Sequence, residues 1–135
     1  MAIFHLAMKP ISRSTGRSAV AAAAYRSGTR LTNVRDGQTY DFTRRAGVVH
    51  AAIVLPTSSA AEWARDRSAL WNAVEAAERR KDARVAREFE IALPHELSAE
   101  QRRALTQAFA QELADHYGAA VDFAIHEPGG AGDVR

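Results

Sequence analysis

Residues 18–28 read SAVAAAAYRSG, and this stretch decides how the first part of the chain folds. It contains five alanines, the residue with the highest helix propensity, and Gly28 suits the position that follows a helix. We therefore predict a helix over 18–27. Successive helical residues are 100° apart, so Val20 and Tyr25 lie about 140° apart around the axis. If Val20 packs inward, Tyr25 points toward solvent or a cleft.

The neighbouring segments predict strands and two further helices around this one. Asp36-Gly37 separates two β-rich runs and is typical of a hairpin turn, whereas Lys9-Pro10 and Pro56 are expected to end strands. A capping box at 59–62 and another helix start at Ser98 open the remaining helices. We predict strands over 3–8, 30–34, 38–43, 48–55, 85–93 and 121–126, and helices over 59–80 and 98–117. The fold class is α+β, with a mainly antiparallel central sheet flanked by helices.

Composition excludes several classes of protein. The chain has 135 residues, 47% hydrophobic and 25% charged, as expected for one domain that buries its own core. It contains no cysteine, so thiolate catalysis, cysteine-bound metal and disulfides are impossible. No apolar run reaches membrane-spanning length, and residues 1–5 do not resemble a signal peptide. We expect no membrane insertion and a cytoplasmic location.

Basic charge is concentrated at the front of the chain. Residues 1–45 carry eight lysines or arginines against two aspartates, and the remainder is net acidic. The guanidinium group of arginine matches phosphate oxygens and stacks on bases. The candidate DNA-binding residues are Arg13, Arg17, Arg26 and Arg30. Biased genomic composition is the alternative explanation, because alanine is over-used as well.

Tyr25 is the candidate nucleophile, because its helical neighbours are too small to cover it and arginines lie nearby in the sequence. Its phenol is almost fully protonated at neutral pH, with an ordinary pKa of about 10, so phosphate attack needs a base, a cation or a metal-polarised phosphate. An ordinary surface tyrosine remains the alternative.

His126 is the candidate metal ligand, because it shares a strand face with Asp122 and precedes a glycine-rich segment. The other four histidines are isolated, and a catalytic divalent ion takes about three protein ligands. Glu88 and Glu90 lie two residues apart in a predicted strand, so both carboxylates point the same way. They could orient a histidine, bind metal or accept a proton, or they could form the solvated face of an edge strand beside Arg84 and Arg87.

Three motifs in order resemble one family. Residues 11–20 (ISRSTGRSAV) with 24–28 (AYRSG) closely resemble the amino-terminal signature of MobA/MobL-type plasmid mobilisation relaxases, which include TraA-like proteins, and residues 2–6 resemble their first strand. Residues 86–94 (AREFEIALP) resemble the second motif, and residues 123–126 (FAIH) resemble the strand that begins the third.

The resemblance implies an HUH endonuclease that acts on single-stranded or hairpin DNA at a transfer origin, with accessory relaxosome proteins as possible partners. In that family a divalent metal, magnesium or manganese, is held by three histidines and polarises a phosphate that a tyrosine attacks. Tyr25 would be the nucleophile and would form a 5′-phosphotyrosyl link that religation reverses. His126 would be the first metal histidine, and Glu88 or Glu90 would be the acidic residue.

The sequence departs from the family pattern at its end. A His-x-His pair is expected shortly after the glycine-rich segment, but the chain ends at Arg135 before one occurs, so one of three expected ligands is present. We therefore expect 1–135 to be an incomplete amino-terminal relaxase domain, truncated at the C-terminus. The alternatives are a catalytically silent module that binds single-stranded DNA and a structural or partner-binding domain.

Overall fold

The structure is a computed structural model that describes residues 5–12, 18–77, 84–94 and 96–127. Its elements are the strands β1 (His5–Ser12), β2 (Arg30–Asn33), β3 (Gln38–Asp41), β4 (Val48–Val54), β5 (Arg84–Ala92) and β6 (Val121–His126), the helices α1 (Ala19–Ser27), α2 (Arg67–Ala77) and α3 (Ala99–Tyr117), and the 3-10 helix η2 (Glu62–Arg65). The predicted α+β class is confirmed. The domain prediction for 1–135 stays a prediction.

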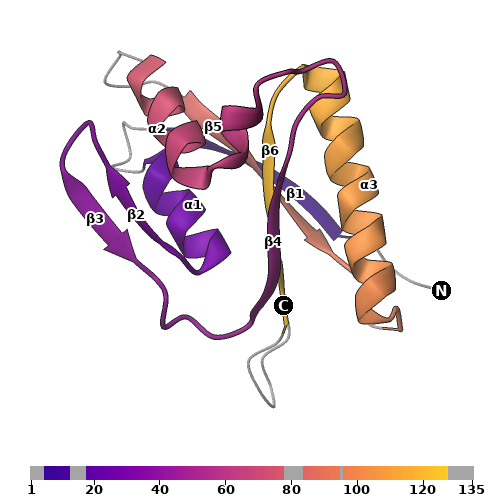
Figure 1. Ribbon diagram of the computed structural model, residues 1–135. Helices are drawn as coiled ribbons and strands as arrows, with labels where there is room; N and C mark the ends of the chain where they lie inside the picture. The colour runs from indigo at the N-terminus through magenta and orange to yellow at the C-terminus, as the bar shows by residue number, and fades with distance from the viewer. Residues whose placement is uncertain (1–4, 13–17, 78–83, 95, 128–135) are drawn as a thin grey trace.

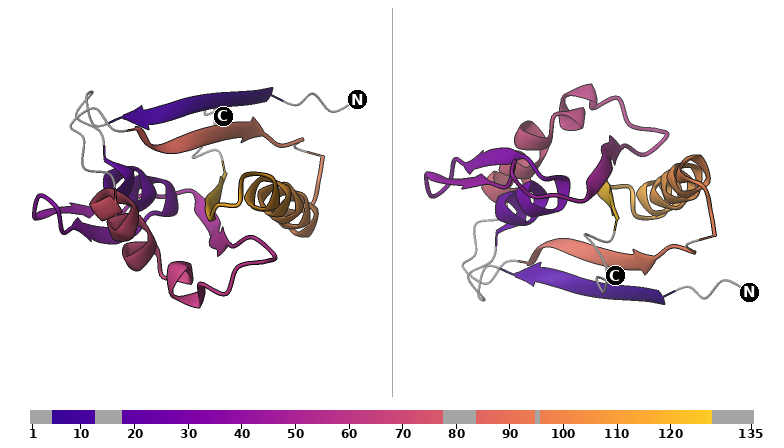
Figure 2. Two further views of the ribbon diagram at one scale, coloured as in Figure 1. Left: turned by 90° about the horizontal axis from the view of Figure 1, so that it is seen from above. Right: turned by 90° about the horizontal axis from the view of Figure 1, so that it is seen from below.

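In the described part of the chain the strands pair two by two, and every pairing is antiparallel. β1 pairs with β5, β2 with β3, and β4 with β6. Figure 1 shows α1 between the β2–β3 hairpin and the β4–β6 pair, with α3 on the far side of β6. Both views of Figure 2 show the β1–β5 pair as a layer across one side of α1, β6 and α3. This arrangement brings the end of α1 next to the end of β6.

Helix α1 forms where the alanine-rich run predicts it. Ser18 caps its first turn by accepting a hydrogen bond from the backbone of Ala21, and Gly28 ends it at φ 66° in the left-handed region that favours glycine. Val20 is fully buried against Leu31 of the hairpin, while Ala19 packs against Ala86 of β5. The alanines allow strands and α2 to approach closely on several sides, so the direction of α1 is firmly set.

The helix predicted over 59–80 is wrong at its beginning. The hydroxyl of Ser59 accepts from Ala61, two residues away, rather than capping a helix, and a single turn, η2, follows. Helix α2 starts after Asp66, whose carboxylate accepts from the backbone of Ala69 at 3.0 Å. This local competition between caps leaves Trp63 57% exposed. Residues 78–80 lie outside the described part.

Two further boundaries differ from prediction. Strand β1 runs through Pro10, where we expected it to end, because β1 pairs on one side only among the described strands and proline is tolerated on an edge strand. The hairpin turn spans residues 34–37 rather than the two residues of a tight turn, and Gly37 alone in that turn has positive φ. The β2 and β3 strands themselves are confirmed.

Helix α3 supports β4 and β6 through small residues. Its N-terminus has the capping box formed by Ser98 and Gln101, as the sequence indicates for a helix start. Ala110 and Ala114 are buried against Val54 and the partly buried Phe123. The alanine positions therefore set how closely α3 approaches the strand that ends in His126.

Candidate functional site

The C-terminus of α1 is the centre of the candidate site. The last carbonyls of a helix have no partner within the helix and carry the negative end of its dipole. Here the carbonyl oxygen of Tyr25 accepts from Nη1 of Arg45 at 3.1 Å, and that of Arg26 lies 2.8 Å from Nε2 of His126. A guanidinium and an imidazole from distant parts of the sequence thus satisfy consecutive helix carbonyls.

The side chain of Tyr25 is held by its ring. Phe42 packs edge-on against it at 5.2 Å between centroids, and the Arg45 guanidinium lies over it at 4.1 Å from the centroid. The Arg26 guanidinium lies at 5.6 Å. Tyr25 is 37% exposed while Val20 is buried, which confirms the predicted division of the helix faces. The Tyr25 side chain is therefore held through contacts of its ring and is partly exposed to solvent, with positive charge over the ring face.

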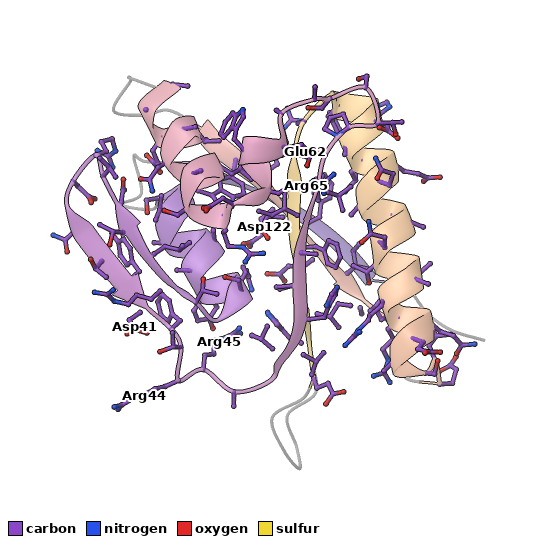
Figure 3. All side chains as sticks on the ribbon, viewed as in Figure 1. Asp41, Arg44, Arg45, Glu62, Arg65 and Asp122 are labelled. Atoms are coloured by element: carbon purple, nitrogen blue, oxygen red, sulfur yellow. The ribbon has the colours of Figure 1, made fainter. Side chains whose placement is uncertain are left out.

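Arg45 is a site residue that the sequence analysis missed. The backbone of Arg45 donates to the carbonyl of Phe42 at 3.0 Å and closes a turn, which the Asp41 carboxylate braces by accepting from the backbone and hydroxyl of Thr43. Figure 3 shows Arg45 turned toward α1 and the β4–β6 pair, and Arg44 turned away from them. The Arg44-Arg45 pair directly after a hairpin was the available signal, but nothing local indicates which arginine turns inward.

Two irregularities place His126 beside α1. The register between β4 and β6 shifts between Val48 and His50, directly opposite the end of β6. Bulges of this kind redirect side chains at strand ends. The Gly47 carbonyl accepts a hydrogen bond from the backbone of Glu127 at 2.8 Å. Gly47 has φ 93°, and a Cβ at this residue would lie 3.0 Å from the Glu127 carbonyl oxygen. A glycine is required for this close approach.

Glu88 and Glu90 point to the same side of β5, as predicted, and both bind Arg26. Glu88 accepts two hydrogen bonds from Arg26, at 2.7 and 2.9 Å, whereas Glu90 accepts one at 3.2 Å. Burial alone lowers the pKa of Arg26, but the hydrogen bond and attraction of Glu88, with the attraction of Glu90, outweigh it and raise this pKa above its ordinary value. The positive charge of Arg26 is thus compensated within the protein.

Asp122 shares the strand face of His126, as predicted, but has different partners. It accepts two hydrogen bonds from Arg67, at 2.7 and 2.9 Å, and one from Nε1 of Trp71 at 2.8 Å. Its side chain is 8% exposed. Asp122 therefore fixes β6 to α2, and we assign it no ligand role.

The remaining predicted site residues lie apart from this centre. Arg30 is exposed on β2, where its charge helps to lower the pKa of Asp41, after the larger effects of the Thr43 hydroxyl and backbone hydrogen bonds. Arg13 and Arg17 lie outside the described residues. Within the described ranges no three histidine, cysteine, aspartate or glutamate side chains are grouped so that they could hold a metal ion. These residues alone do not fit a complete metal centre.

The comparison with protein families identifies the chain. The model of the MobA/MobL family matches residues 17–133. The chain belongs to the MobA/MobL family. The predicted family resemblance is confirmed, and the match includes Tyr25, Glu88, Glu90 and His126 in its range.

Relatives of this MobA/MobL chain carry names from plasmid transfer. It is 53% identical to mobilization protein MobL of Acidithiobacillus ferridurans over 128 residues, which are 95% of this chain and 33% of the relative. It is 43% identical to conjugal transfer protein TraA of Rhizobium radiobacter over 137 residues, covering 94% of this chain and 12% of the relative. The chain thus spans a third or less of these relatives.

A solved structure has the same fold. A chain from the work "Molecular Basis of Vancomycin Resistance Transfer in Staphylococcus aureus" matches with a TM-score of 0.88 and 32% identity. The match covers 93% of this MobA/MobL chain and 63% of that chain. Among the described helices, none has both the length and the apolar character needed to cross a bilayer.

Proposed function

We propose that this MobA/MobL chain forms part of a DNA relaxase that nicks single-stranded DNA at a plasmid transfer origin during conjugative transfer. Tyr25 is the proposed nucleophile, and the intermediate is a 5′-phosphotyrosyl link. The names of the relatives support the process, and the site supports the chemistry. The observation that carries the proposal is that Tyr25 and His126 meet at one helix end, where Arg45 contacts both.

The proposed reaction is a transesterification. The phenolic oxygen of Tyr25 attacks phosphorus and forms a new P–O bond, and the bond from phosphorus to the 3′ oxygen breaks. The phenol gives up its proton, and the leaving 3′ oxygen takes one up to become a free hydroxyl. The number of phosphoester bonds is unchanged, so religation runs the same steps backwards without ATP.

Glu88 and Glu90 are the proposed acidic residues, with different roles. Glu88 is 12% exposed and holds Arg26 through two hydrogen bonds, so it orients the residue next to Tyr25. Glu90 is 45% exposed and makes one longer contact, so it is the better candidate to accept a proton.

A divalent ion, magnesium or manganese, belongs to the same family proposal. We propose His126 as a ligand, since its exposed imidazole lies beside the nucleophile's helix. Because the described residues offer no group of three ligands, we assign no step of the reaction to an ion.

We propose a second candidate function, supported by the basic charge of residues 1–45, in which the chain binds single-stranded DNA without cutting it. Arg13, Arg17 and Arg30 are the proposed backbone contacts in either case, and origin hairpin DNA is the proposed partner. Each arginine that neutralises a phosphate adds to the salt dependence of the affinity. Arg13→Ala and Arg17→Ala are each expected to reduce the salt slope, and unchanged slopes would exclude these contacts. Accessory proteins stay a prediction.

A covalent adduct assay tests the nicking proposal. The chain is incubated with manganese and a labelled single-stranded origin oligonucleotide, and a DNA–protein adduct is sought on denaturing gels. Tyr25→Phe should abolish the adduct. The matched control is Tyr117→Phe, since Tyr117 is an exposed tyrosine on α3, away from the site, and should leave the adduct intact.

The outcomes separate the two functions. An adduct that persists in Tyr25→Phe excludes Tyr25 as the nucleophile. Salt-sensitive binding with no adduct in the wild-type chain supports the binding module. If the wild-type chain shows neither binding nor an adduct, both proposals are contradicted.

A further inference from the structure

The described arginines differ in whether an acidic side chain compensates their charge. Arg26, Arg35 and Arg67 each bind a carboxylate within 3.2 Å or less. Arg45 makes no ion pair with any carboxylate in the described part of the chain, although it is half-buried at the same helix end. A half-buried guanidinium without a counter-ion keeps its full charge for a ligand, and in partly desolvated surroundings that charge acts more strongly than in water.

The geometry of Arg45 leaves donors available. The two polar contacts of its side chain with described residues both come from Nη1, to the Tyr25 carbonyl at 3.1 Å and to Nε2 of His126 at 3.2 Å. Nε and Nη2 make no hydrogen bond within the described ranges. A planar guanidinium can stack on an aromatic ring with its face while its edge binds phosphate oxygens in a bidentate manner. Arg45 already stacks on Tyr25, at 4.1 Å from the ring centroid.

The contact between Arg45 and His126 adds another available donor. Nε2 of His126 lies closer to the Arg26 carbonyl, at 2.8 Å, than to Arg45. A carbonyl can only accept, so the shorter contact requires a proton on Nε2, and that nitrogen then cannot accept from Arg45. The second N–H of Nη1 is therefore left facing another donor. An anion beside the phenol would satisfy it.

We infer that Arg45 binds the DNA phosphodiester that Tyr25 attacks, and that Arg26 does not. This assignment rests on the proposed function for the identity of the phosphodiester. The guanidinium holds two phosphate oxygens next to the phenol, and it stabilises the negative charge that grows on those oxygens as the fifth bond to phosphorus forms. Arg26 instead keeps α1 attached to β5 through Glu88.

Arg44 provides a matched control for Arg45. The two arginines are adjacent and carry the same charge, but Arg44 is exposed and turned away from α1. A purely delocalised effect of charge on DNA binding should be equal for Arg44→Gln and Arg45→Gln. A contact with one particular phosphate should be lost in Arg45→Gln alone.

The experiment measures which phosphate each arginine contacts. In a Tyr25→Phe background, which retains the ring, affinity is measured for a set of origin oligonucleotides, each with one neutral methylphosphonate. Contacts of Arg13, Arg17 and Arg30 should give sensitive positions of their own. At the phosphate that Tyr25 attacks, we expect the neutral substitution to weaken binding about tenfold, as for a lost charged hydrogen bond. Arg45→Gln should bind the unmodified oligonucleotide as weakly as the parent chain binds the one substituted at that position, and the methylphosphonate there should weaken its binding no further. Arg44→Gln should still lose the full affinity when that phosphate is made neutral. An equal loss at every position in both variants overturns the inference.

Folding and function are checked separately. If Arg45→Gln does not fold, the Nε–H resonance of Arg45 in the Tyr25→Phe chain reports the contact directly. It should shift when the unmodified oligonucleotide is added and shift less with the methylphosphonate at the sensitive position. An unaltered resonance overturns the inference.

The adduct assay distinguishes this failure from failure of the proposed function. If an adduct forms but Arg45 and the nicked phosphate show no coupling, the inference for Arg45 is wrong and the proposal for Tyr25 as the nucleophile stands. Coupling at one phosphate without an adduct keeps Arg45 as a phosphate-binding residue and removes the nicking proposal.

Discussion

Nε2 of His126 lies 2.8 Å from the carbonyl oxygen of Arg26, a residue 100 positions earlier in the chain. The contact ties the end of β6 to the end of α1, so the two segments that carry the candidate ligand and the candidate nucleophile cannot move independently. A helix carbonyl end also attracts positive charge, which favours a donor at this position.

The first prediction concerns the tautomer of His126. Because the Arg26 carbonyl accepts, neutral His126 should carry its proton on Nε2 and leave Nδ1 as the acceptor. Long-range proton–nitrogen NMR distinguishes the two tautomers by the chemical shifts of the ring nitrogens. His50, which makes no hydrogen bond with the described residues, serves as the reference. A proton found on Nδ1 of His126 would mean that Arg45, not the Arg26 carbonyl, is the partner of Nε2.

The second prediction separates the two acidic residues of β5. Glu88 accepts two hydrogen bonds and is largely buried, so Glu88→Gln should lower the free energy of unfolding by about 1–2 kcal/mol. Glu90 has one longer contact and is more exposed, so Glu90→Gln should cost less than about 0.5 kcal/mol. Urea denaturation measures both. Equal costs would show that the two carboxylates share Arg26 evenly.

Local signals predicted most of the elements but few of the contacts that form the site. The alanine run and Gly28 are enough to predict α1 and the outward face of Tyr25, and alternation predicts that Glu88 and Glu90 point together. Arg45 could not be chosen over Arg44 from the sequence, because the choice depends on a turn that packs against α1.

The burial of a charged residue, Glu75, could not be predicted from the sequence either. Glu75 lies on α2, within the helix predicted over 59–80, yet it is 1% exposed. Its carboxylate accepts from the backbone of Ala19 at the start of α1 and from Arg35. Periodicity classifies residues by polarity, so it cannot identify a carboxylate that is buried because it binds another helix's N-terminus.

The third prediction concerns the attachment of β6 to α2. Asp122→Ala leaves Arg67 without its buried partner and Trp71 without its acceptor, so the free energy of unfolding should fall by about 3 kcal/mol. Glu62→Ala is the control, since Figure 3 shows Glu62 and Arg65 as neighbours on η2 and both are exposed. Its cost should stay within about 0.5 kcal/mol. Similar costs for the two variants, measured by thermal and urea unfolding, would show that Asp122 does not act as a buried anchor.

The fourth prediction uses the close approach of α3 to β6. Ala114 is fully buried, so Ala114→Leu must force α3 away from the strands and should cost about 2 kcal/mol. Ala108 is exposed on the same helix, and Ala108→Leu should be nearly neutral. Amide chemical shifts should change along β6 as far as His126 in the first variant and not in the second. If Ala114→Leu unfolds at the same urea concentration as wild type, the helix is not in tight contact with the strands.

The last prediction concerns acid stability at the C-terminal end of α3. The backbone of Thr57 donates to Asp115 at 2.6 Å, and the hydroxyl of Thr57 and the amide of Gln111 donate as well. Chiefly through the backbone hydrogen bond, and against a smaller opposing effect of desolvation, these donors hold the pKa of Asp115 below its ordinary value. A folded-state pKa below the unfolded value of about 3.9 means that the contribution of Asp115 is complete above that pH and is lost as the pH falls through the lowered folded value. Asp115→Asn should therefore lower stability at neutral pH and remove part of the decline in acid. Urea denaturation at neutral and acidic pH measures this difference, and a variant with an unchanged acid profile would show that Asp115 titrates alike in the folded and unfolded chains.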